Sequence, residues 1–184
     1  MSWITPPNQS QYPWYLRIFY ALQRRKLGWV PEPVLLWGRT PRVFIAFLRL
    51  YKAFDRKSSP LEASLRSLLM VRISQINICP FCIDLNASHA LARGIPQEKL
   101  EALDGYANSP LFSEIEKAAL EFAETMTITG RTVGPGLQQR LKAHFSDDAI
   151  IELAGLIAYQ NMSSKFNAGL DVPAQGFCKL PVRS

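Results

Sequence analysis

Apolar residues recur at three- and four-residue spacing along most of the chain, which is the pattern of helices with one buried face. Proline, glycine, serine and threonine interrupt the pattern where helices typically begin and end. No segment alternates between apolar and polar residues as a half-buried strand does. The chain is therefore expected to be all-α. The predicted helices cover residues 13–27, 41–56, 61–76, 80–93, 96–106, 113–129, 135–145 and 146–161, with an arm before 13, a turn leading into 34–37 and an irregular tail from 171.

Several helix starts are marked by their capping residues. Thr40 before Pro41 and Ser59 before Pro60 are pairs of an N-cap residue and a proline suited to the first helical position. A serine and a glutamate three positions apart, within residues 113–116, form a capping box. These signals predict helices that begin at or directly after each pair.

The spacing also predicts which face of a helix is buried. Trp14, Ile18 and Leu22 recur on one side of the first helix, and its arginines lie elsewhere. In the helix over 113–129, the apolar side holds Ile115, Ala119, Phe122 and Met126. We expect these side chains to face inward.

Composition fits a soluble protein of one domain. The 184 residues are 48% hydrophobic and 20% charged, with a mean hydropathy of −0.01. The longest purely apolar run, residues 43–48, is far shorter than the roughly 20 residues of a membrane span. The N-terminus has no signal-peptide pattern, and three cysteines with one close pair suit a reducing compartment. A cytoplasmic protein is expected.

The net charge of +6 is concentrated in the first third of the chain. Residues 1–60 hold 10 Lys and Arg against 2 Asp and Glu. Such a segment with interleaved aromatics can bind nucleic acid or an anionic membrane surface. No nucleic-acid-binding motif accompanies the charge, so solvated faces of amphipathic helices are the favoured interpretation. Nucleic acid is not an expected partner, and contact of the basic arm with a membrane surface is disfavoured.

Two of the three cysteines, Cys79 and Cys82, lie close together with Pro80 between them. Proline favours the first position of a helix, which places Cys79 at the N-cap and Cys82 in the first turn. There the unpaired backbone N–H groups and the positive end of the helix dipole favour a thiolate over a thiol. The pair has the outline of a redox dithiol.

Three interpretations of the cysteine pair compete. A zinc site needs two further ligands, and Cys178, His89 and His144 are isolated in the sequence, so no metal is expected. Two buried structural thiols remain possible, although the proline at a helix start favours dithiol chemistry. A thioredoxin fold would require strands on either side of the motif, and the sequence predicts none, so a redox pair here would lie on a helical scaffold. Cys178 is either a second resolving thiol or, as we favour, a packed side chain.

Helical geometry assigns one face of the cysteine helix to further polar residues. At about 100° per residue, Cys82, Asn86, His89 and Arg93 form one stripe. His89 lies about 10.5 Å along the axis from Cys82, so proton exchange between them would need water or bridging groups. A surface or interface role for His89 is equally open.

Residues 68–77, with the sequence LLMVRISQIN, followed by residues 79–84, with the sequence CPFCID, resemble the carboxymuconolactone decarboxylase-like superfamily. The likeness is greatest to its alkyl hydroperoxidase D-type branch, which carries the CxxC pair, and extends over about residues 59–170. It divides the chain into a basic N-terminal arm with helices, residues 1–58, and an alkyl hydroperoxidase D-like helical domain, residues 59–184, packed as one unit. It implies a single-domain helical bundle, a homo-oligomer (dimer, trimer or hexamer) and no cofactor.

The resemblance also implies roles for the two cysteines. In peroxidatic members the second cysteine attacks a hydroperoxide, the first closes a disulfide with it, and an external dithiol reduces the pair again. These roles would fall on Cys82 and Cys79. The expected partners are therefore a small-molecule hydroperoxide and a dithiol reductant.

The chain departs from the family at the proton relay. The positions of the family's glutamate and histidine are Ser67 and Asn86, and neither side chain can act as a general base near neutral pH. Thiolate formation would then depend on the helix terminus, Arg72 or His89, and lost acid–base help typically costs 10²–10⁴-fold in rate. The sequence predicts an attenuated thiol peroxidase of the peroxiredoxin type. The alternative is a non-catalytic helical protein that binds ligands or senses redox state.

Overall fold

The computed structural model describes residues 1–178. Over this range the chain is helical and contains no strand, so the all-α prediction is confirmed. The elements are η1 (Gln9–Gln11), α1 (Trp14–Leu27), α2 (Glu32–Trp37), α3 (Pro41–Phe54), α4 (Ala63–Ile76), α5 (Pro80–Ala92), α6 (Gln97–Glu101), η2 (Leu103–Asn108), α7 (Glu114–Thr127), α8 (Pro135–His144) and α9 (Asp147–Gly169).

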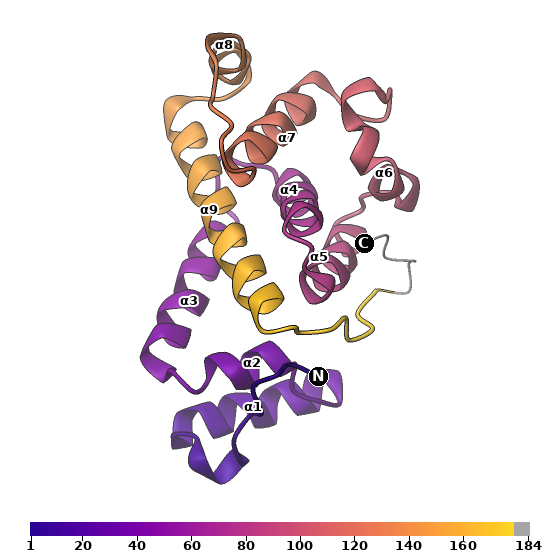
Figure 1. The fold of residues 1–184 in the computed structure, drawn as a ribbon. Coiled ribbons are helices and arrows are strands. Elements are labelled where there is room, and N and C mark those ends of the chain that lie inside the picture. The colour runs from indigo at the N-terminus through magenta and orange to yellow at the C-terminus, as the bar shows by residue number, and fades with distance from the viewer. Residues whose placement is uncertain (179–184) are drawn as a thin grey trace.

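Helix α4 lies at the centre of the bundle, with α5, α7 and α9 packed around it (Figure 1). It is buried on almost every side, including its serines Ser67 and Ser74. A helix that is apolar all round belongs in a core rather than on a surface. The largest hydrophobic cluster accordingly joins α4 to α7 and α9.

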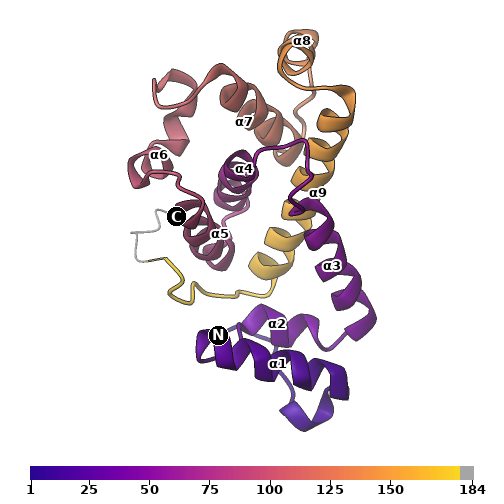
Figure 2. The ribbon, with the colours of Figure 1, turned by 180° about the vertical axis from the view of Figure 1, so that it is seen from behind.

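Helices α1 and α2 lie side by side at one end of the molecule, and α3 connects them to the bundle by running along α9 (Figures 1 and 2). Their own apolar cluster is built on Tyr12, Leu16, Tyr20, Trp37 and Phe44. Phe166 of α9 packs against this cluster, so the N-terminal helices share a wall with the bundle.

After α9 the chain turns back and crosses the end of α5 (Figure 2). The turn is made at Asp171, a non-glycine residue with a positive φ of 54°. The next residue, Val172, is buried with Phe81 and the two cysteines in a third apolar cluster. The described part of the predicted irregular tail, residues 171–178, is thus packed against the bundle, and we call it the C-terminal strap. The rest of that predicted tail lies outside the described residues.

Two of the predicted helix starts are confirmed and one is wrong. The capping box of Ser113 with Glu116 is present, and α3 begins at Pro41 as expected. Helix α4 begins at Ala63 rather than at residue 61, because the Ser59 hydroxyl accepts a hydrogen bond from the Leu61 amide and donates to a side chain of α9 instead of capping a helix.

Two predicted helices do not run to the ends that the sequence predicted. The helix over 96–106 is broken into α6 and η2, with Gly105 in a non-helical conformation. Helix α9 continues to Gly169 instead of ending at residue 161, because the polar side chain of Asn161 is bound by Asn77 and Thr127 and so does not end the helix.

The predicted buried face of α1 is wrong. Trp14, Ile18 and Leu22 are 71%, 55% and 60% exposed, whereas Leu16 and Tyr20 are buried. The buried face contains tyrosine, and the Tyr20 hydroxyl is satisfied by a backbone carbonyl of α2. Apolar spacing alone could not distinguish the two faces. In α7, Ala119 and Phe122 are buried as predicted, whereas Ile115 and Met126 are more than a third exposed.

None of the helices formed by the described residues is long and apolar enough to cross a membrane.

Candidate functional site

The turn between α4 and α5 sets the position of the cysteine pair. Ile78 adopts a left-handed conformation, with φ 49°, which is uncommon for a β-branched residue. Its amide donates to the Gln75 carbonyl (3.0 Å), and the Cys79 amide donates to the Ser74 carbonyl (3.1 Å). The chain therefore reverses within three residues, and α5 starts directly behind the end of α4.

Helix α5 begins as the sequence predicts, with Pro80 in its first position and Cys79 as N-cap. The Cys79 sulfur accepts a hydrogen bond from the Cys82 amide at 3.2 Å. The sulfur thus takes the place of the oxygen that usually caps a helix. All three cysteines of the chain are free thiols.

The surroundings of Cys82 favour its ionised form. Its pKa lies below the usual value, chiefly because the Cys79 thiol donates to its sulfur and although burial acts in the opposite direction. Asn167 donates from Nδ2 at 3.3 Å, and the nearby Ser163 and Ser164 hydroxyls lower the Cys82 pKa further. The Cys79 pKa is raised, because its thiol donates to Cys82 and because it is buried. The pair is therefore arranged as one thiolate beside one thiol.

Cys82 lines a cavity of about 630 Å³ although its residue surface is only 2% exposed. Cys82 is thus a buried residue at the edge of a cavity. Most of the cavity wall is apolar, and its aromatic side chains come from α2, α3, α5, α9 and the C-terminal strap. They are Trp37, Phe44, Phe47, Tyr51, Phe81, Tyr159 and Phe177.

Three members of the predicted polar stripe, Cys82, Asn86 and His89, line this cavity. Burial lowers the pKa of His89, and the positive charge of Arg93 lowers it further. Because the shift is downward from 6.5, His89 is mostly neutral at neutral pH. Asn86 is held from behind, since its Nδ2 donates to the Ser74 hydroxyl (3.0 Å).

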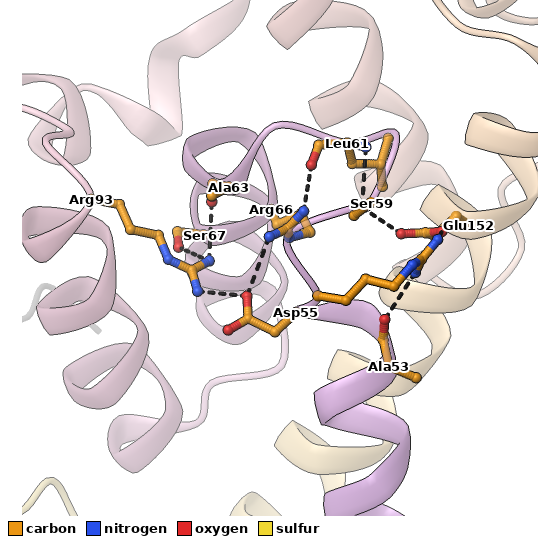
Figure 3. Close-up of polar contacts among 10 residues, drawn as sticks. Ala53, Asp55, Ser59, Leu61, Ala63, Arg66, Ser67, Arg93 and Glu152 are labelled. Carbon is orange, nitrogen blue, oxygen red and sulfur yellow. Dashed lines mark hydrogen bonds and ion pairs between the residues drawn. The ribbon is translucent and has the colours of Figure 1, made fainter.

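Arg93, the fourth member of the stripe, does not line the cavity, and its side chain extends toward Asp55 and Ser67 (Figure 3). Its guanidinium pairs with Asp55 (2.5 Å) and donates to the Ser67 hydroxyl (3.0 Å). Ser67, at the position where the family has its glutamate, is therefore part of a buried polar contact and does not line the cavity.

Arg72 is also remote from the cysteine pair. Its guanidinium pairs with Glu124 (2.6 Å) and with Asp104, and it does not line the cavity. The structure therefore gives it no part in stabilising the Cys82 thiolate. The donors that do this come from Cys79 and α9.

Sequence reasoning missed the α9 donors Asn167, Ser163 and Ser164, because the helix was expected to end at residue 161. No apolar pattern could have revealed them, because the buried residues of α9 beyond residue 161 are the polar side chains of Ser164 and Asn167. Among residues 1–178, no three His, Cys, Asp or Glu side chains are grouped so that they could hold a metal ion.

Replacing Asn167 by leucine is expected to move the ionisation of Cys82 to higher pH. The change removes a donor to the thiolate, which costs about 1.5–3 kcal/mol for a bond to a charged group. It removes little else, because Asn167 Oδ1 accepts no hydrogen bond from residues 1–178. The rate of Cys82 alkylation by iodoacetamide, measured against pH, checks this. An unchanged midpoint in the Asn167→Leu protein would show that this bond does not stabilise the thiolate.

Sequence comparisons place the chain among known proteins. The carboxymuconolactone decarboxylase family model matches residues 41–125. The chain is 41% identical over 175 residues to the uncharacterized protein YnjA of Escherichia coli K12, covering 95% of this chain and 96% of YnjA. It is 30% identical over 115 residues to the uncharacterized protein YdfG of Bacillus subtilis 168, covering 62% of this chain and 78% of YdfG.

Solved structures share the fold. A peroxidase-related protein with an alkylhydroperoxidase AhpD core, from Ralstonia eutropha JMP134, matches with a TM-score of 0.83 at 21% identity, over 96% of this chain and 94% of that one. The debrominase Bmp8 matches with a TM-score of 0.81 at 24% identity, over the same shares. The shared fold thus extends into the helices before residue 59, which the sequence resemblance did not include. The fold, the CxxC-bearing helix and the relatives lead to one assignment: the chain belongs to the carboxymuconolactone decarboxylase family.

Proposed function

We propose that the protein reduces organic hydroperoxides with the Cys79–Cys82 dithiol, as a thiol peroxidase of low rate. The supporting observation is the arrangement of the two sulfurs. Cys82 lines the cavity with its ionisation favoured, and Cys79 lies beside it holding a proton. Peroxide reduction by a dithiol needs these two parts, a thiolate that meets the substrate and a thiol that meets the oxidised sulfur.

In the first step the Cys82 sulfur attacks the terminal oxygen of the hydroperoxide. An S–O bond forms and the O–O bond breaks, and its electron pair leaves on the alkoxide, which takes a proton and departs as the alcohol. Cys82 is then a sulfenic acid. In the second step the Cys79 sulfur attacks Cys82, a disulfide forms and water leaves. An external dithiol returns two electrons and two protons.

The low rate follows from what has replaced the relay. Ser67 is bound by Arg93 and Asn86 by Ser74, so neither is placed to move a proton in the cavity. His89 lines the cavity, but its lowered pKa leaves it mostly neutral at neutral pH, so little of it carries the proton that the departing alkoxide needs. General acid–base help is typically worth 10²–10⁴-fold, and we expect a deficit in this range.

Oxidation by one equivalent of cumene hydroperoxide tests the proposal. The reduced Cys178→Ser protein is used, because only the motif thiols can then pair. We expect one equivalent of alcohol, and a peptide carrying Cys79 and Cys82 that is lighter by two hydrogen atoms. Dithiothreitol should restore the thiols and sustain turnover. Persistence of both thiols and of the peroxide would contradict the proposal and favour a non-catalytic protein.

A second candidate is reductive dehalogenation, favoured by the aromatic wall beside Cys82. The debrominase Bmp8 shares the fold, and a cysteine-to-alanine variant of it forms a complex with 2,3,4-tribromopyrrole. Here Cys82 would take bromine from a ring carbon, which keeps the bond's electron pair and gains a proton. Cys79 would then displace bromide to form the disulfide. Release of bromide from 2,3,4-tribromopyrrole by the reduced protein distinguishes this reaction from peroxide reduction.

A further inference from the structure

Asp84 is a buried carboxylate on the helix that carries Cys82. Its residue surface is 1% exposed, and it forms no ion pair with any of residues 1–178. It accepts hydrogen bonds from three backbone amides instead, those of Gln175 (2.8 Å), Phe177 (3.1 Å) and Cys178 (2.6 Å). Bonds from amides to a carboxylate are roughly twice as strong as neutral ones. Asp84 therefore fastens the C-terminal strap to α5, one helical half-turn from the nucleophile.

The strap is fastened at a second point, to the start of α2. The Glu32 amide donates to Gln175 Oε1 (3.2 Å), and Gln175 Nε2 donates to the Glu32 carboxylate (3.4 Å). The strap consequently bridges α5 and α2 (Figure 2). Both helices contribute residues to the cavity wall. Its course across the end of α5 is held by side-chain anchors and not by helix formation.

Phe177 is the strap residue that reaches the cavity. Its ring meets the Phe81 ring edge to face, with centroids 5.9 Å apart and planes at 88°, and lies 5.1 Å from the Trp29 ring. Phe81 also lines the cavity and precedes Cys82 in the chain. The aromatic wall next to the nucleophile is thus completed by a side chain from the far end of the sequence.

We propose that Phe177 is a specificity-determining residue of the thiol site and Asp84 its positioning residue. Phe177 contacts the apolar part of the substrate, so the site selects hydroperoxides with an aromatic or similarly bulky apolar group over hydrogen peroxide. This inference rests on the function proposed above and narrows its substrates to hydroperoxides with an aromatic or similarly bulky apolar group.

The cavity size supports this choice. At about 630 Å³ it lies within the range of sites that enclose drug-sized ligands, and hydrogen peroxide would occupy a small part of it. Affinity for an organic hydroperoxide would come from the aromatic walls, whereas the reacting O–O group would meet only the few polar side chains around Cys82. An aromatic contact contributes enough free energy for about a tenfold change in binding.

The test compares cumene hydroperoxide with hydrogen peroxide in the Phe177→Ala protein. We expect the KM for cumene hydroperoxide to rise about tenfold with kcat nearly unchanged, and the rate with hydrogen peroxide to stay within about twofold. Asp84→Asn should shift the same KM in the same direction by loosening the strap. Leu170→Ala is the matched control, because Leu170 packs in the same apolar cluster but does not line the cavity. It should leave the ratio of the two rates unchanged.

Two readouts keep the inference separate from the reaction. Methyl methanethiosulfonate should modify Cys82 equally fast in wild type and Phe177→Ala, which shows that the nucleophile is intact. Binding of 2-phenyl-2-propanol, the alcohol product, should weaken about tenfold in Phe177→Ala. If wild type binds the alcohol but reduces no peroxide, the proposed function fails and the specificity assignment stands. Equal binding by both proteins, no binding by wild type, or equal losses with both peroxides would overturn the assignment.

Discussion

Cys82→Ser is expected to lose hydroperoxide reduction altogether, whereas Cys79→Ser is expected to complete the first step and then stop. Cys82 is the sulfur that lines the cavity and whose ionisation is favoured, so a serine there leaves no nucleophile. Turnover with dithiothreitol should fall by at least about 10³-fold. In Cys79→Ser the nucleophile remains, but the protein has no second motif thiol to attack the sulfenic acid, so the oxidised state accumulates when no dithiol is added. One equivalent of alcohol should appear, followed by no disulfide.

Trapping with dimedone, read by mass spectrometry, checks the assignment of roles. The adduct is expected on Cys82 in the Cys79→Ser protein and on no residue in Cys82→Ser. Cys178→Ser should turn over at the wild-type rate, because its side chain packs against the main core and not against the motif sulfurs. A dimedone adduct on Cys79 in the Cys82→Ser protein would reverse the roles.

Losing Cys79 has a second consequence, which concerns pH. The Cys79 thiol is the largest cause of the lowered Cys82 pKa, and a serine hydroxyl bonds to a thiolate with different geometry. The first step in Cys79→Ser should therefore be compared with wild type across pH and not at one pH. A higher ionisation midpoint is the direction expected, since donation from the Cys79 thiol is the largest cause of the lowered Cys82 pKa.

The cysteine motif could be placed from the sequence because its geometry is local. Proline fixes the first turn of α5, and the N-cap and first-turn positions of the two cysteines follow from that one residue. The stripe of Cys82, Asn86 and His89 follows from helical periodicity alone. Local rules also gave the capping box of α7, because both of its partners lie within one turn.

The rest of the site depends on contacts between distant parts of the chain. Asn167 meets Cys82 across 85 positions, and Phe177 reaches the cavity only because amides of the strap bind Asp84. In the sequence, Asp84 is an unremarked acidic residue on a helix. Its burial and its three amide partners depend on how α5, α9 and the strap pack, which no periodicity encodes.

For Arg72 and Ser67 the sequence suggested a role near the thiol that the packing does not provide. Both were considered as supports for the thiol, and both are engaged in polar contacts away from the cavity. A charged or hydroxyl side chain near the motif in sequence has several possible partners, and the fold chooses among them. The donors to the thiolate came from α9 instead.

Ser74→Ala is expected to destabilise the fold by about 2–3 kcal/mol, a large effect for the loss of one oxygen atom. Ser74 is fully buried in the last turn of α4, and its hydroxyl donates to the Met70 carbonyl (2.6 Å). The same oxygen accepts from Asn86 Nδ2 and from Gln160 Nε2, each at 3.0 Å. Removing it leaves two buried amide groups each without one acceptor, at a cost of about 1–3 kcal/mol for each unsatisfied group.

The loss is limited because each amide keeps another bond, Gln160 to the Ser164 hydroxyl (2.9 Å) and Asn86 to the Met70 carbonyl (3.4 Å). The melting temperature should fall by roughly 4–12 °C for a chain of this size. Ser64→Ala is the matched control on the same helix, since Ser64 is half-buried and its hydroxyl bonds to none of the described residues. Thermal unfolding of both variants measures the difference, which should approach zero only if the Ser74 hydroxyl does not join α4 to α5 and α9.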